Sequence, residues 1–265
     1  MRRALRIIPI YIAFLVSVVL FILYRSGKFP SDFLYYLTYS QNIYWVLSVN
    51  PAEFSLRASS LLSHTWTLAI EEQFYLLWPL IIYLTPNRLL PYVSSAVVIL
   101  GIVFRLVAVL NSQNYLVVSI LLFSQIDLLA MGSILAIYKT GHFDIDIRKY
   151  VKWAGFIGVL GIISVVSYIA IKYGVSLFVA YSYFRKPEFY ALDLFTVNIY
   201  FFIGLVSIAL IYQCVFRSNN YLYNRILSNK YITHIGKISY GLYLYHWPVY
   251  ILLSGRFNNR ALRGF

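Results

Sequence analysis

Long apolar segments recur along this chain and limit the folds that it can adopt. The first, Ile7–Tyr24, has 18 residues and no charged side chain. A helix of about 20 apolar residues spans the hydrocarbon core of a bilayer. Hydrophobic residues make up 61% of the sequence and charged residues 12%, whereas about 25% of the residues of a soluble domain are charged. The sequence therefore predicts an all-α, polytopic transmembrane helical bundle.

Eight segments are candidates for the membrane-spanning helices. They are residues 7–24, 33–49, 68–84, 92–110, 115–138, 151–171, 194–216 and 236–253. The segment 33–49 is the weakest, because three polar residues lie at positions 40–42, and it could instead be re-entrant or lie at the membrane interface. We therefore expect about seven to eight helices, in a single transmembrane domain that covers residues 1–265.

The chain is strongly basic, with a formal net charge of +13. Most Lys and Arg side chains lie in short segments between apolar runs, where they orient the helices and contact lipid phosphates. We therefore expect these basic residues to contact the lipid bilayer, and we expect no nucleic acid as a partner. The single cysteine, Cys214, cannot form an internal disulfide, and its apolar surroundings predict a small buried residue. No Cys/His cluster has the spacing of a metal site.

Two adjacent carboxylates, Glu71 and Glu72, lie near the start of an apolar run and follow His64 by seven and eight positions. A charged carboxylate at the centre of a membrane helix costs about 2.5–3.5 kcal/mol, so the pair indicates a cavity lined by protein or water. If a helix begins before His64, His64 and Glu71 share nearly one face, two turns apart. We interpret all three as candidate catalytic residues that move or orient a proton. Alternatively, the glutamates pair with arginines of neighbouring helices.

A basic cluster, Arg2, Arg3 and Arg6, precedes the first apolar run. Helical spacing brings two of these guanidinium groups to one face, and guanidinium groups bind phosphate oxygens in pairs. The cluster is a candidate site for a phosphorylated cytoplasmic ligand. On these residues alone, simple anchoring of the first span at the cytoplasmic surface is the favoured interpretation.

Two further charges, Arg105 and Asp127, lie inside consecutive apolar runs. Each would be costly in lipid without a partner, so we predict an ion pair between them, with a structural role. Arg105 could instead extend to the lipid headgroups. His246 lies among aromatic residues, which is typical of a hydrogen-bonded packing residue.

Four motifs together resemble acyltransferase family 3, whose members are integral membrane O-acyltransferases that modify bacterial surface sugars. They are Arg2-Arg3-x-x-Arg6-Ile-x-Pro9, His64-Thr-Trp-Thr-Leu-x-x-Glu71-Glu72-Gln-Phe-Tyr-x-x-Trp-Pro79, Asp127-x-Leu-x-x-Gly132 and Gly236-Lys-Ile-Ser-Tyr-x-Leu-Tyr-x-x-His246-Trp-Pro248. They occur in the family's order and span nearly the whole chain. The long Glu-Glu motif is fairly specific, and each of the other three alone is weak.

The resemblance implies a bundle of roughly ten helices in the bacterial cytoplasmic (inner) membrane. An acyl group, commonly acetyl, would pass from cytoplasmic acyl-CoA to a hydroxyl group of a surface polysaccharide or lipopolysaccharide sugar. The acceptor would be a carbohydrate or a lipid-linked sugar. Arg2, Arg3 and Arg6 would then bind the CoA phosphates, and Glu71 would belong to the reaction chamber. Acyl-CoA, with acetyl-CoA as the expected form, would be a co-substrate, and we expect no bound cofactor or metal.

The chain departs from the family pattern at its start. In the family, two helices precede the arginine motif, and the first carries an arginine and the histidine that is taken as the catalytic base. This sequence begins at the arginine motif, so we expect a chain that is N-terminally truncated relative to the family. Neither His64 nor His246 matches the family's histidine. The alternatives are a proton-coupled transporter of a sugar or lipid intermediate, or an inactive fragment that acts only as a membrane scaffold.

Overall fold

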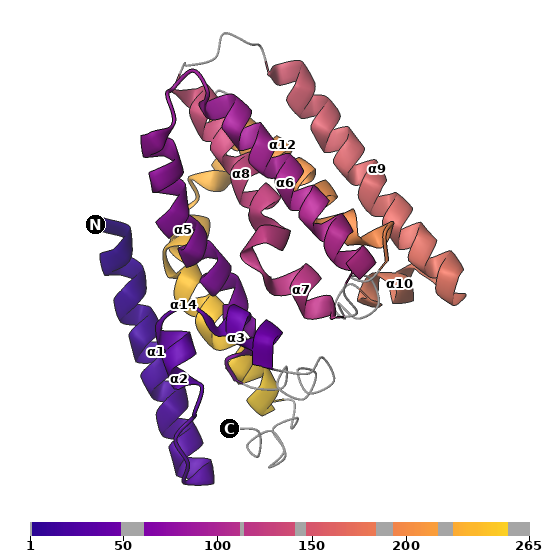
Figure 1. Ribbon diagram of the computed structural model, residues 1–265. Helices are drawn as coiled ribbons and strands as arrows, with labels where there is room; N and C mark the ends of the chain where they lie inside the picture. Colours follow the sequence, from indigo (N-terminus) through magenta and orange to yellow (C-terminus); the bar gives the residue numbers. More distant parts are fainter. Residues whose placement is uncertain are drawn as a thin grey trace. The chain divides into compact units, whose positions relative to one another are not determined.

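The computed structural model describes residues 2–48, 61–111, 114–140, 147–183, 193–216 and 225–253, and side chains from residue 7 onward. Within these ranges the regular structure is helical and contains no strand (Figure 1), which confirms the predicted all-α class. The elements are α1 (Arg2–Ser26), α2 (Phe33–Leu37), α3 (Gln41–Ser48), η1 (Ser63–Thr65), α5 (Trp66–Leu84), α6 (Leu90–Asn111), α7 (Tyr115–Ile120), α8 (Leu122–Lys139), α9 (Arg148–Tyr173), α10 (Leu177–Tyr183), η2 (Thr196–Asn198), α12 (Ile199–Phe216) and α14 (Lys230–Leu253).

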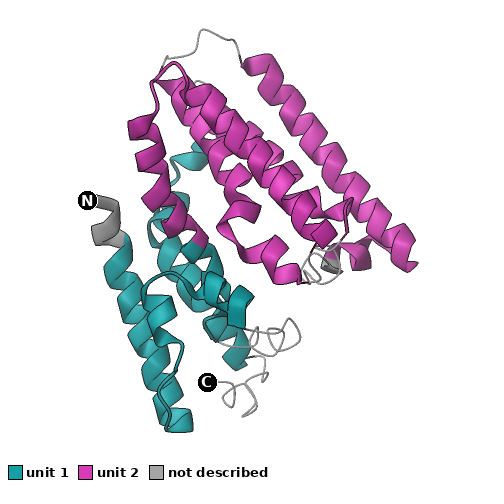
Figure 2. Ribbon diagram, in the orientation of Figure 1, with its two compact units in different colours: residues 1–69, 221–265 teal, residues 70–220 magenta. Residues whose placement is uncertain are grey.

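The chain forms two compact units (Figure 2). Unit 1 comprises residues 1–69 and 221–265, so it joins both ends of the sequence, and unit 2 comprises residues 70–220. Helix α5 begins in unit 1 with its first four residues and continues in unit 2. Each unit is described below by itself.

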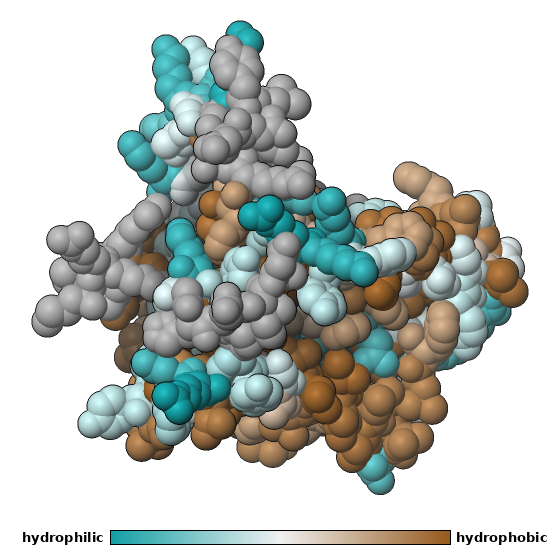
Figure 3. Space-filling model, turned by 90° about the horizontal axis from the view of Figure 1, so that it is seen from above, coloured by the Kyte–Doolittle hydropathy of each residue, from teal (hydrophilic) through white to brown (hydrophobic). Residues whose placement is uncertain are grey.

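Five segments are long and apolar enough to cross a membrane. They are Ile7–Ser26, Leu90–Asn111, Tyr115–Lys139, Arg148–Tyr173 and Thr196–Phe216. Each coincides with one of the eight predicted spans, which supports a multi-pass membrane protein. Hydrophobic side chains also cover much of the face shown in Figure 3, as expected for helices that contact lipid.

The prediction of one continuous span over residues 33–49 is wrong. The segment folds as two short helices, α2 with five residues and α3 with eight, and eight helical residues extend only about 12 Å. Tyr39 ends α2 in the left-handed conformation, with φ 53°. The Ser40 amide then donates to the Tyr35 carbonyl at 2.8 Å, which is the backbone pattern of a Schellman helix end. Such an end reverses the chain, so the two helices cannot form one rod.

Unit 2 is built on close helix packing. Helix α9 presents Gly155, Gly158 and Gly161 to α12, and a Cβ atom on Gly158 would lie 2.8 Å from the Phe202 carbonyl oxygen. Only glycine therefore permits this approach of the two backbones. Small residues at helix contacts are typical of helix pairs in membranes, where apolar burial alone does not drive helix association.

The predicted ion pair between Arg105 and Asp127 is confirmed inside unit 2. Both side chains have 0% exposure. Arg105 Nη1 donates to Asp127 Oδ1 at 2.7 Å, and Nη2 donates to Oδ2 at 2.6 Å. The same Nη1 also donates to the Ser124 carbonyl. The two-point geometry joins α6 to α8 and satisfies charges that lipid would not solvate.

The prediction that Cys214 is buried is wrong, because its side chain is exposed. Helix α12 is apolar on every side and buries few of its residues, Ile199, Gly204 and Tyr212 among them. An apolar sequence context therefore does not distinguish an inward face from an outward face in a helix of this kind.

Candidate active site

The Glu-Glu motif begins in a short 3₁₀ turn and continues as an α-helix. His64 is the central residue of η1, and α5 begins only at Trp66. The proposed shared helix face of His64 and Glu71 required a helix that begins before His64, and that condition is not met. His64 lies in unit 1, whereas the two carboxylates lie in unit 2.

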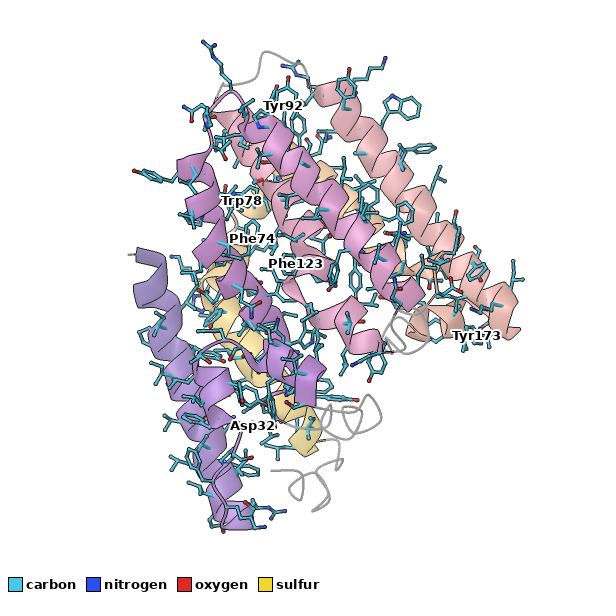
Figure 4. The ribbon with its side chains drawn as sticks, in the orientation of Figure 1. Asp32, Phe74, Trp78, Tyr92, Phe123 and Tyr173 are labelled. Carbon is cyan, nitrogen blue, oxygen red and sulfur yellow. The ribbon has the colours of Figure 1, made fainter. Side chains whose placement is uncertain are left out.

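Glu71 and Glu72 lie near the start of α5, and both are half-buried within the structure. One turn further along, the Tyr75 hydroxyl donates to Glu71 Oε2 at 3.5 Å. Phe74 and Trp78 are buried on the same helix, with their rings stacked at a centroid distance of 4.9 Å, and Figure 4 labels both side chains on α5. Glu71 thus has a hydroxyl neighbour one turn further along the same helix.

The structure brings His64 together with residues of α14. His64 Nε2 lies 3.0 Å from the Leu244 carbonyl oxygen, although the two residues are 180 positions apart. The Tyr243 hydroxyl donates to the His64 carbonyl at 2.9 Å and also pairs with the Thr67 hydroxyl. We call these residues, with His246, the His64 cluster. It joins the long Glu-Glu motif to the C-terminal motif within unit 1.

His246 completes this cluster from the outside. Its side chain is exposed, its Nδ1 lies 2.5 Å from the Tyr243 carbonyl, and its ring meets the His64 ring edge-on at 5.3 Å between centroids. The interpretation of His246 as a hydrogen-bonded residue among aromatic rings agrees with these contacts. It is a neighbour of His64 rather than a deeply buried packing residue.

The environment of His64 favours the neutral imidazole. The ring lies outside the five candidate spans and is half-buried. Burial and, second, the nearby His246 lower the pKa of His64 to about 4, against the opposite effect of its hydrogen bond to the Leu244 carbonyl. A neutral imidazole has one nitrogen that donates and one that accepts a proton. At neutral pH, His64 is therefore uncharged, and one ring nitrogen can accept a hydrogen bond.

A buried amide supports the η1 turn from α3. Gln41 Nε2 donates to the Thr65 carbonyl at 2.9 Å and to the Thr65 hydroxyl at 3.2 Å, and neither residue is exposed. The polar residues that weakened the predicted span over 33–49 thus include one that holds the turn carrying His64. In the sequence, the only indication of this support was an amide inside an apolar run. Nothing in the sequence indicated the contact between Tyr243 and Thr67.

The predicted CoA-binding residues, Arg2, Arg3 and Arg6, lie in the first two turns of α1. Their side chains fall outside the part of the chain that the structure describes, so their role stays a prediction. Within the residues that can be placed, no group of three or more His, Cys, Asp and Glu side chains gathers as a metal site would require.

Comparison with known proteins decides the family. A family model described as "Acyltransferase domain" matches residues 1–263. The chain belongs to acyltransferase family 3. The resemblance predicted from the four motifs is therefore confirmed.

Acyltransferase family 3 relatives with similar sequences are named O-acetyltransferase OatA. The protein from Staphylococcus aureus strain NCTC 8325 / PS 47 is 29% identical over 269 residues, which cover 96% of this chain and 40% of the relative. The proteins from strains COL and MRSA252 give the same values. The chain thus spans 40% of the length of the curated relatives that it matches. No solved structure matches the chain.

Proposed function

We propose that this chain acts as a membrane O-acyltransferase that moves an acyl group, commonly acetyl, from acyl-CoA to a hydroxyl group of a surface polysaccharide or lipopolysaccharide sugar. The observation that carries the proposal is the family match over residues 1–263. The name of the Staphylococcus aureus relatives specifies O-acetyl transfer, and the five apolar helices fit a site in the bacterial cytoplasmic membrane.

The proposed reaction is the attack of a sugar hydroxyl on the thioester carbonyl carbon. The new C–O bond forms, the C–S bond breaks, and the proton of the hydroxyl passes through a base to the departing thiolate, giving an O-acyl ester and free CoA. A hydroxyl is a poor nucleophile until a base accepts its proton. Glu71 is the first candidate to orient or charge that base, and its half-burial and Tyr75 contact support the assignment. Glu72 is the second candidate.

The acyl donor would bind at the start of α1. Arg2 and Arg6 are four positions apart in a continuous helix, which is the spacing of neighbouring positions on a helix surface. The apolar span begins at Ile7, directly after them, and we propose that the phosphates of acyl-CoA bind at the membrane surface next to this end of the span. Two-point guanidinium contacts bind phosphate oxygens well.

The test measures release of CoA and transfer of labelled acetyl groups to cell-surface sugars in membranes that contain the chain. We expect Glu71→Gln to lower acyl transfer about 100-fold or more, which is the usual contribution of acid–base groups. Neutralising Arg2 and Arg6 together is expected to raise the KM for acetyl-CoA. Arg148→Gln, an exposed arginine at the start of α9, is the matched control for charge. Sugar uptake without acyl turnover in the wild-type chain would contradict the proposal and favour the transporter.

A further inference from the structure

One nitrogen of the His64 ring has a fixed role in the folded chain. A main-chain carbonyl oxygen can only accept a hydrogen bond. The 3.0 Å contact between His64 Nε2 and the Leu244 carbonyl therefore requires the proton of the neutral ring to be on Nε2. The other nitrogen, Nδ1, then carries a free lone pair. A neighbouring hydrogen bond commonly fixes a histidine tautomer in this way.

His64 Nδ1 is covered and has no hydrogen-bond partner among the residues that the structure describes. Buried polar atoms in folded proteins are nearly always paired, so an unpaired acceptor calls for a specific explanation. A hydroxyl group of a ligand is the simplest partner, because it donates one proton and needs little space. This explanation also agrees with the neutral state of the ring, which preserves the lone pair.

The surroundings of the ring are suited to a sugar hydroxyl. Phe14, Tyr243 and His246 place their rings around His64, at centroid distances of 5.9, 5.5 and 5.3 Å. Binding sites for small molecules typically combine such aromatic walls with a few fixed polar atoms. Phe14 is fully buried, whereas His246 is exposed. Exposed side chains change rotamer within nanoseconds, so a ligand can approach the imidazole from the side of His246.

The position of the turn is itself held by α14. The Tyr243 hydroxyl binds the His64 carbonyl while the next residue of α14, Leu244, binds the His64 ring. From α3, the Gln41 amide donates to the carbonyl of Thr65, the residue after His64. Main chain and ring are thus fixed from two helices, so that Nδ1 has a constant direction. Such preorganisation is what an orienting or proton-accepting group requires.

We propose that His64 Nδ1 accepts a hydrogen bond from the hydroxyl group of the acceptor sugar, with Tyr243 and the Leu244 carbonyl as the groups that position it. The inference rests on the proposed O-acyltransferase function and names the atom that binds the attacking hydroxyl. In the reaction, the C–O bond forms and the C–S bond breaks, and the hydroxyl proton passes by way of Nδ1 to the departing thiolate. The aromatic rings around His64 then define where the sugar binds.

The first experiment determines the tautomer without any turnover. Histidine labelled with ¹⁵N in the full chain, in lipid nanodiscs near neutral pH, reports which ring nitrogen carries the proton, and His64→Gln identifies the His64 signals. We expect a protonated Nε2 and an unprotonated Nδ1. A proton on Nδ1 overturns the inference while leaving the proposed function intact.

The second experiment measures acyl transfer to the sugars of cells that express each variant. In His64→Gln the amide nitrogen can still donate to the Leu244 carbonyl, but no acceptor remains at the position of Nδ1. We expect transfer to fall about 100-fold, with the KM for acetyl-CoA unchanged. The matched control is His234→Gln, the same change at an exposed position of α14, which should keep wild-type transfer.

Wild-type transfer in a folded His64→Gln protein overturns the role of Nδ1. An absence of transfer in the wild-type chain overturns the proposed function and, with it, the hydroxyl role. The tautomer measurement distinguishes this case from an error in the geometry, because it requires no substrate.

Discussion

The two units differ in how completely the hydrogen-bonding atoms of their buried polar side chains are paired. In unit 2, the side chains of Arg105 and Asp127 have no exposed surface. Each terminal guanidinium nitrogen of Arg105 donates to one carboxylate oxygen of Asp127. Arg105 Nε has no partner within the described ranges, but both side chains are fully buried. In unit 1, His64 is half-buried and uses one ring nitrogen, which leaves the other with a lone pair.

This difference separates a structural group from a chemical one. A charge pair with no exposed surface inside a helix bundle can fix two helices, and its main interaction is already made within the pair. A histidine that is fixed at one nitrogen and unpaired at the other can accept a hydrogen bond in a defined direction. Burial alone therefore does not identify an active site, and neither does a single unpaired atom; in His64 the unpaired atom belongs to a fixed imidazole within the Glu-Glu motif.

The largest expected effect comes from breaking the ion pair of unit 2. Asp127→Ala leaves the Arg105 guanidinium buried without its counter-charge, which typically costs about 3–5 kcal/mol. We expect strongly reduced amounts of folded protein, measured by size-exclusion chromatography of detergent extracts. The exchanged double variant, Arg105→Asp with Asp127→Arg, should recover part of the loss. If the double variant is no more stable than either single exchange, the pair is not what holds α6 to α8.

A smaller effect is expected from protonation of His64 in unit 1. In the unfolded chain histidine titrates near pH 6.5, whereas in the folded chain burial and the nearby His246 lower the pKa of His64 to about 4. Between these values the unfolded chain binds more protons, so stability falls as the pH decreases from about 6.5 to 4, and it is level above that range.

The loss in this pH range is at most about 3 kcal/mol. The apparent Tm of the detergent-solubilised protein measures it, and His64→Gln should remove most of the slope. An equal slope in wild type and variant would show that His64 is not the titrating group.

The smallest effect concerns the hydroxyl that holds the η1 turn. Tyr243→Phe removes the hydrogen bonds to the His64 carbonyl and the Thr67 hydroxyl, and each neutral hydrogen bond contributes about 1 kcal/mol. We expect a Tm decrease of a few degrees and a lower kcat for acyl transfer, with the KM for acetyl-CoA unchanged. Tyr245→Phe is the matched control, because Tyr245 lies on the same helix as Tyr243. Its hydroxyl is more exposed and lies 3.4 Å from the Ser17 hydroxyl of α1. Equal effects of the two changes would exclude a positioning role for Tyr243.

Some of this arrangement could be predicted because few alternatives exist in lipid. Five apolar runs form the expected long helices, and the Arg105–Asp127 pair follows from two opposite charges in consecutive spans. The break within residues 33–49 could not be predicted in the same way. It depends on Tyr39 in a left-handed conformation, which residues other than glycine and asparagine seldom adopt.

The candidate site was predictable in its residues but not in its geometry. The motif pattern identified Glu71, Glu72 and His64, because ionisable groups in an apolar sequence are rarely incidental. The contact of His64 with Tyr243 and Leu244 joins residues about 180 positions apart, and helical periodicity carries no information over that distance. The choice between the two ring nitrogens depends on this contact alone.

The most direct test of the assignment of the chemistry to the Glu-Glu motif is acyl transfer by membranes that contain either Glu71→Gln or His64→Gln. Folded protein is quantified in the same samples, and labelled acetyl-CoA is the donor. We predict that both variants fold in near-normal amounts and lose about 99% of the wild-type transfer. Full transfer by either folded variant would contradict the assignment of the chemistry to this motif.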